Sequence, residues 1–159
     1  LLLAWASLAD PFVRGRLAAR FAAQGVAPER LLLEGARPHA AMLARYGAVD
    51  IALDPFPFSG GATSAEALWM GVPVVTLPGA RPASRQTLAM LAAKGLVVWA
   101  ATSEAGFLDI AAAPGADPVG LARLRAGQRA AMAASALCDA AGLARALEAA
   151  FAEMLAPGL

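Results

Sequence analysis

Cysteine, lysine and histidine each occur only once in the 159-residue sequence, as Cys138, Lys94 and His39. A single cysteine excludes an intrachain disulfide and a cysteine-based zinc site. The sequence does not assign a carboxylate and a nucleophile to the lone histidine, so no catalytic triad is indicated. Hydrophobic residues make up 59% of the chain, but no uninterrupted apolar run reaches the roughly 18 residues of a membrane span.

An excess of either charge is also missing, since 13 basic and 12 acidic residues leave a formal net charge of +1. The sequence therefore has no electrostatic footprint for long nucleic acids. No secretory signal stands at the start, so a reducing, cytoplasmic location is the expectation. The chain begins with LLLAWA, inside an apolar run and without a methionine, so we expect the natural polypeptide to be longer.

The most informative stretch covers residues 49–76, VDIALDPFPFSGGATSAEALWMGVPVVT. Residues 49–53 form a short apolar run typical of a strand buried on both faces, and the prolines that follow end it. A helix is predicted for residues 62–70, closed by Gly71, and residues 72–77 predict the next parallel strand. The order is strand, glycine-rich turn, helix and strand.

In such a unit the turn lies beyond the carboxyl end of the first strand, where open α/β sheets bind ligands. Gly60 and Gly61 remove side chains, so backbone N–H groups can approach an anion closely, and the helix start adds unpaired donors. Thr63 adds a hydroxyl, and Glu66 could accept a hydrogen bond from a ribose. The pattern favours a phosphate-bearing nucleotide, although its spacing alone also fits a tight turn that binds nothing.

Strands and helices alternate along the rest of the chain, which predicts an α/β fold of the doubly wound, Rossmann-like kind. Further strands are expected at residues 1–6, 31–33 and 96–99, giving five parallel strands with helices on both faces. We expect a single domain over residues 1–159, with an α/β core at 1–113 and C-terminal helices at 117–155. Ser84 is expected to cap a helix at 85–94, and the side chains expected in the core include Trp69, Trp99 and Phe151.

Three separated blocks carry a family resemblance: DIALDPFPFSGGATSAEALWMGVPVVTLPG, ASRQTLAMLAAKGL, and SALCD before an amphipathic helix. In order and spacing they resemble the C-terminal part of bacterial O-GlcNAc transferase/SPINDLY-type glycosyltransferases, over Leu1 to about Met154. The resemblance implies the GT-B architecture, in which two Rossmann-like domains face each other across a cleft and the C-terminal one holds the sugar nucleotide. It also implies that the first strand of this domain lies upstream of Leu1.

The resemblance further implies roles for individual residues. It places the pyrophosphate on backbone amides of the turn, the ribose on Glu66 and His39, and the uracil beside Ala36, Arg37 and Arg45. Two departures stand out: Ala62 replaces a threonine and Met42 replaces a histidine that relatives place against the base. The expected donor-binding residues are Ala36, Arg37, His39, Met42, Arg45, Ser59, Gly60, Gly61, Ala62, Thr63 and Glu66.

The activity implied by the resemblance is an inverting transfer of N-acetylglucosamine from UDP to protein serine or threonine, without a metal or other cofactor. The phosphate-bridging lysine and the key histidine are expected upstream, together with a catalytic domain and tetratricopeptide repeats. Two alternatives stay open. One is a related transferase that uses GDP-fucose or UDP-glucose, and the other is a non-catalytic nucleotide-binding or scaffold protein.

Overall fold

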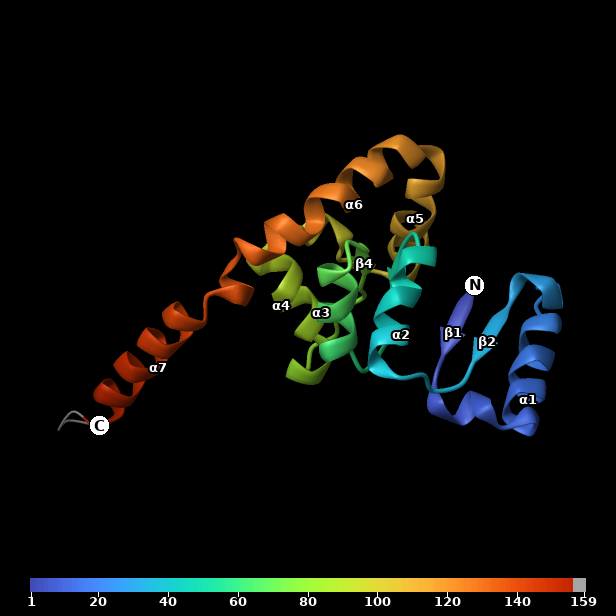
Figure 1. Ribbon diagram of the computed structural model, residues 1–159, viewed down its shortest axis with the longest axis horizontal. Coiled ribbons are helices and arrows are strands. Elements are labelled where there is room, and N and C mark those ends of the chain that lie inside the picture. Colours follow the sequence, from blue (N-terminus) through green and yellow to red (C-terminus); the bar gives the residue numbers. More distant parts are fainter. Residues whose placement is uncertain (156–159) are drawn as a thin grey trace. The chain divides into compact units, whose positions relative to one another are not determined.

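The computed structural model describes residues 1–155, which form two compact units. The first unit comprises residues 1–45, and the second begins at Tyr46. Each unit contains one pair of parallel strands, together with helices (Figure 1). Whether the two units make up one domain stays a prediction. No helix within residues 1–155 has the length and apolar character needed to cross a membrane.

In the first unit, β1 (Leu2–Ala4) and β2 (Leu32–Glu34) pair in parallel, with Leu2 opposite Leu32 and Ala4 opposite Glu34. The helix between them begins where Asp10 accepts a hydrogen bond from the Phe12 N–H at 2.8 Å, as the Asp-Pro pair predicts. The elements of this unit, drawn in blue to cyan in Figure 1, are β1 (Leu2–Ala4), α1 (Pro11–Ala22), β2 (Leu32–Glu34) and α2 (His39–Arg45).

The second unit contains another parallel pair and most of the helices. Its elements are β3 (Ala52–Leu53), α3 (Ala62–Trp69), β4 (Val74–Val75), α4 (Gln86–Ala93), α5 (Glu104–Ala112), α6 (Pro118–Ala133) and α7 (Ala140–Leu155). Ala52 lies opposite Val74 and Leu53 opposite Val75, and a single parallel bridge joins Thr76 to Ala100.

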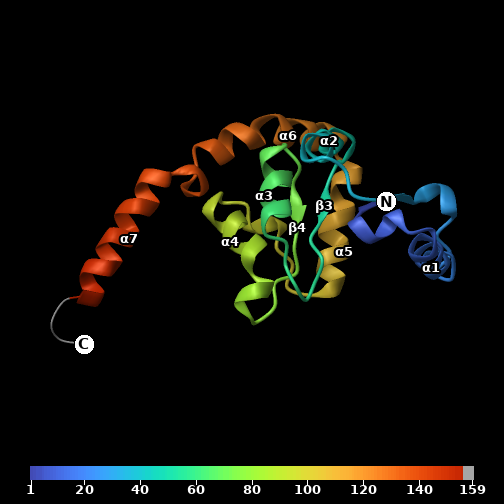
Figure 2. The ribbon, with the colours of Figure 1, turned by 60° about the horizontal axis from the view of Figure 1, so that its bottom comes forward.

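Helices cover both faces of the β3–β4 pair (Figure 2). Successive residues of a strand point to opposite faces. Val74 packs into a core with Leu68, Leu91 and Met132, which come from α3, α4 and α6. Val75 instead packs with Ala101 and with Phe107 of α5. The predicted α/β fold with parallel strands is therefore confirmed.

The prediction of five strands is wrong for the described residues, which form four short strands in two separate pairs. The run at 96–99 is not a strand, because Gly95 adopts a φ of +69° that ends α4, and one 3-10 turn, Val97–Trp99, follows. Val98 is 73% exposed, so the run is not buried either. The strand expected to be buried at 49–53 is reduced to two residues, and Leu53 is 45% exposed.

Three other expectations need correction. Ser84 does not cap α4; its hydroxyl donates to the Arg81 carbonyl at 2.7 Å. Phe151 lies on α7 and is 58% exposed, so it is not a core residue among the described part of the chain. Trp69 is 38% exposed and lies under the guanidinium of Arg129, 5.0 Å from the ring centre, an arrangement that stabilises a partly solvated indole.

Candidate functional site

The glycine-rich turn occupies the position that the sequence predicts, between the carboxyl end of β3 and the first residue of α3. β4 is parallel to β3, so the loop after β4 leaves the same edge of the pair. Asp54, directly after β3, is 3% exposed. The turn is therefore anchored at one side by a buried residue that follows a strand, and it opens a helix at the other.

The Asp54 carboxylate accepts hydrogen bonds from three donors around the turn. Its Oδ1 atom accepts from the Gly60 N–H at 2.6 Å. Its Oδ2 atom accepts from the hydroxyls of Ser59 at 3.0 Å and Thr76 at 2.7 Å. A buried carboxylate is stable only when such donors satisfy it, so the side chain is a structural centre of the turn. A structural role is also what the sequence favours for Asp54, which stands next to Pro55.

Thr87, on α4, closes the network from the opposite side and is fully buried. Its backbone N–H donates to Ser59 Oγ at 3.0 Å, so Ser59 satisfies one of the unpaired donors at the start of α4. Its hydroxyl donates to the Gly60 carbonyl at 3.2 Å and contacts the Ser64 hydroxyl at 2.8 Å. Ser59 is itself 2% exposed, so its hydroxyl serves the protein interior.

The next three amides of the turn face a different environment. Within residues 1–155, the N–H groups of Gly61, Ala62 and Thr63 have no acceptor in the protein. Gly61 is half-buried, while Ala62 and Thr63 are exposed at the start of α3. Unpaired donors at a helix start, with the positive end of the helix dipole behind them, favour an anion. These are the amides that the sequence predicts for a diphosphate.

Gly60 is required for steric reasons, not for an unusual φ angle. A Cβ at this position would overlap the Ser64 hydroxyl and would lie 3.1 Å from Asp54 Oδ1. A Cβ at Gly61 would meet only Gln86 Oε1, at 3.1 Å, the end of a flexible side chain. Of the two glycines, the first is therefore the one that the packing of the turn demands.

Tyr46, for which the sequence predicts no role, contacts the start of α3. Its hydroxyl donates to the Thr63 carbonyl oxygen at 3.1 Å. Burial raises the pKa of the Tyr46 phenol, and the negative charge of Glu66 raises it further. Tyr46 thus contacts the start of α3, the helix that carries Glu66.

The predicted residues of the first unit lie on and before α2. Glu34, the last residue of β2, binds two of them: Arg37 Nε lies 3.0 Å from one carboxylate oxygen, and Arg45 pairs with the other. Glu34 therefore holds two guanidinium groups together, a role that its position in the sequence did not reveal. Ala36 is exposed, His39 begins α2 and Met42 is half-buried within it.

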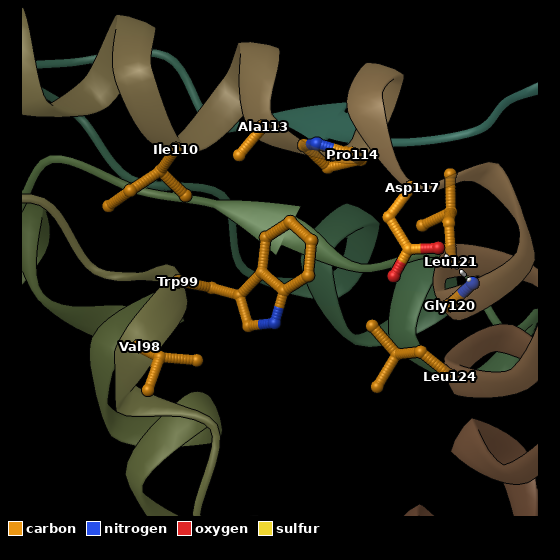
Figure 3. A pocket seen from close by; sticks show the side chains of 9 residues that line it. All are labelled: Val98, Trp99, Ile110, Ala113, Pro114, Asp117, Gly120, Leu121 and Leu124. Atoms are coloured by element: carbon orange, nitrogen blue, oxygen red, sulfur yellow. Dashed lines mark hydrogen bonds between the residues drawn. The ribbon is translucent and has the colours of Figure 1, made fainter.

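The second unit also contains an apolar cavity of about 350 Å³ that shares no residue with the turn. Figure 3 shows the indole of Trp99 facing it, with Leu121 and Leu124 of α6 on the other side. Its only acid is Asp117, whose Oδ1 accepts from the Gly120 N–H at 2.8 Å and so caps α6. The cavity is mostly apolar and its one charged side chain is an acid, so we do not place a nucleotide there.

No group of three histidine, cysteine, aspartate or glutamate side chains within residues 1–155 is arranged to hold a metal ion. The expectation of a reaction without metal or cofactor stays a prediction.

Comparison with known proteins gives the class of the fold first. The structure matches an O-GlcNAc transferase mutant from Thermobaculum terrenum with a TM-score of 0.89 and 41% sequence identity, over 97% of this chain and 30% of that chain. The α/β fold is thus that of a glycosyltransferase. Residues 8–147 match glycosyl transferase family 41, and the chain belongs to this family. The resemblance inferred from the sequence is confirmed.

Plant relatives give the same result. The chain is 38% identical over 109 residues to the "Probable UDP-N-acetylglucosamine--peptide N-acetylglucosaminyltransferase SPINDLY" of Oryza sativa subsp. japonica. It is 35% identical over 109 residues to the protein of the same name from Arabidopsis thaliana. Each alignment covers 69% of this chain and 12% of the plant protein. The chain therefore spans only a small part of its relatives.

Proposed function

We propose that the chain is the donor-binding part of a transferase that moves N-acetylglucosamine from UDP to serine or threonine of a protein. One observation carries the proposal: the amides of Gly61, Ala62 and Thr63 are unpaired within the described residues, at the start of a helix and beyond the carboxyl end of a parallel strand. Such an arrangement suits a diphosphate. The names of the relatives support UDP-N-acetylglucosamine as the donor.

The chemistry proposed for these amides follows from where charge develops. In a direct, inverting displacement, the acceptor hydroxyl attacks the anomeric carbon and the bond to the diphosphate breaks. Negative charge then grows on the leaving diphosphate, and donors already aimed at it stabilise the transition state more than the ground state. No metal is needed for this role if the amides and a lysine from outside this chain share the charge.

The nucleoside end of the donor is assigned to the residues that the sequence predicts for it. We assign the ribose to Glu66, on the second turn of α3, and to His39. Arg45 is assigned to the base, which Ala36 and Arg37 contact through main-chain groups, and Met42 is assigned as an apolar contact. Glu34 would hold both arginines in place.

The proposal is tested by titrating UDP, UDP-N-acetylglucosamine, GDP-fucose and UDP-glucose by calorimetry into the polypeptide as the source organism produces it, with and without EDTA. We expect UDP and UDP-N-acetylglucosamine to bind, and we expect EDTA to leave the affinity for both unchanged. Preference for GDP-fucose or UDP-glucose would replace the donor assignment. Binding of none of the four would leave the scaffold alternative.

The ribose assignment makes a separate prediction about Glu66. The Glu66→Ala variant should bind UDP about 10-fold or more weakly, because a hydrogen bond between a charged group and the ribose is lost. Glu148→Ala, which removes a carboxylate from the exposed face of α7, is the matched control and should bind UDP like the parent. A Glu66→Ala variant that binds UDP as tightly as the parent contradicts the assignment.

A further inference from the structure

The peptide between Gly60 and Gly61 separates the buried network from the exposed amides. Both polar groups of Gly60 are bonded inside the protein, the N–H to Asp54 Oδ1 at 2.6 Å and the carbonyl to the Thr87 hydroxyl at 3.2 Å. Thr87 is fully buried and Asp54 is 3% exposed, so neither side chain can reach a ligand at the surface.

The geometry of a peptide bond connects these contacts to the proposed site. The bond between Gly60 and Gly61 is trans, since Phe56–Pro57 is the only cis peptide within residues 1–155. In a planar trans peptide, the carbonyl of one residue and the N–H of the next point in opposite directions. Because the Gly60 carbonyl points inward to Thr87, the Gly61 N–H must point outward. Glycine has many accessible backbone conformations, so without this bond the plane is free to rotate.

We infer that Thr87 is a positioning residue, whose buried hydroxyl orients the Gly61 N–H toward the donor diphosphate. Asp54 assists by accepting a hydrogen bond from the Gly60 N–H. The Ser59 hydroxyl connects the two side chains, because it bonds to the Asp54 carboxylate and to the hydroxyl and backbone N–H of Thr87. The inference rests on the proposed function, because it needs an anion at the turn. It adds a residue on another helix, 28 positions from Ser59, to the machinery of the site.

The experiment compares Thr87→Val, which keeps the shape but removes the hydroxyl, with Thr87→Ser, which keeps the hydroxyl. Affinity for UDP and for uridine, which lacks phosphates, is measured on the polypeptide as the organism produces it. We expect Thr87→Val to weaken UDP binding about 10- to 100-fold, because the Gly61 N–H is no longer oriented and its hydrogen bond to the charged diphosphate is lost. Uridine binding should stay unchanged. Thr87→Ser should restore UDP binding.

The outcomes separate the two proposals. A parent protein that does not bind UDP contradicts the proposed function itself. If the parent binds UDP, three results overturn the role of Thr87: unchanged UDP affinity in Thr87→Val, an equal loss for UDP and uridine, or a Thr87→Ser variant as weak as Thr87→Val.

A measurement on the unaltered protein keeps the inference testable if Thr87→Val does not fold. Amide hydrogen exchange should show the Gly60 N–H protected at all times, because Asp54 accepts from it. The Gly61 N–H should exchange fast in the absence of ligand and become protected when UDP is added. A Gly61 N–H that is already protected without UDP would mean that it points into the protein, and would overturn the inference.

Discussion

At the scale of single residues, the proton of Tyr46 reports on the surroundings of the turn. Burial, followed by the charge of Glu66, raises the pKa of the phenol above its ordinary value of about 10. Folding therefore favours the neutral phenol. The contribution of the neutral Tyr46 phenol to the stability of the folded state is fully present below about pH 10. It is lost as the pH rises through the higher pKa that this phenol has in the folded chain.

We predict that Glu66→Gln lowers the pKa of Tyr46, because it removes a negative charge near the phenol. The value should stay above that of an exposed tyrosine, since burial is the larger cause. The chain has one tyrosine, so phenolate absorbance during a pH titration measures this group alone. Glu148→Gln, on α7, is the control and should not change the titration. An unchanged pKa in Glu66→Gln would place the carboxylate away from Tyr46.

The residues of the turn also show what sequence reasoning can find. The order of strand, Ser-Gly-Gly and helix is local, so the positions of Gly61, Ala62 and Thr63 at the start of α3 could be predicted from residue types. The network beneath them could not. Ser59 and Thr87 are 28 residues apart, and only packing of α4 against the turn brings their hydroxyls to 3.0 Å. Glu34 was missed for the same reason, since its arginine at position 45 lies eleven residues away.

At the scale of elements, helices were predicted more accurately than strands. Caps are local signals, and Asp10, Ser103, Asp117 and Asp139 each accept a hydrogen bond from a backbone N–H at the start of a helix. Strand length depends on partners elsewhere in the chain. Apolar runs of five or six residues predicted strands, but pairing limits β3 and β4 to two residues each.

The helices of the second unit differ in how much of them is buried, which leads to a prediction. Leu68 of α3 is fully buried, whereas Leu147 of α7 is 47% exposed. Leu68→Ala should lower the free energy of unfolding by about 2–5 kcal/mol, the cost of a cavity in a packed core. Leu147→Ala should change it by less than about 0.5 kcal/mol. Urea denaturation of the 159-residue chain compares the two. Equal losses would show that α7 packs as tightly as α3.

At the scale of the whole molecule, burial is unequal between the two units. Among residues 1–155, the first unit buries Leu8 and Leu31, while the second buries nine hydrophobic side chains as well as Pro73. Buried apolar area is the main source of stability, so the second unit should open less often.

We therefore predict faster amide hydrogen exchange in β1 and β2 than in α3 and β4. The comparison is made within one sample of the 159-residue chain by following individual amides. The Val72 N–H, which is bonded to the Ala67 carbonyl at 2.8 Å, serves as a reference in the second unit. Equal protection in both units would mean that they unfold together, as expected of one domain.

The peptide joining Gly60 and Gly61 has a consequence beyond orientation, because its two ends are electronically coupled. An anion that accepts from the Gly61 N–H increases electron density on the Gly60 oxygen, which makes that oxygen a better acceptor for the Thr87 hydroxyl. An anion bound at the surface should therefore strengthen the buried hydrogen bond between Thr87 and Gly60, through a single amide plane and without movement of any helix.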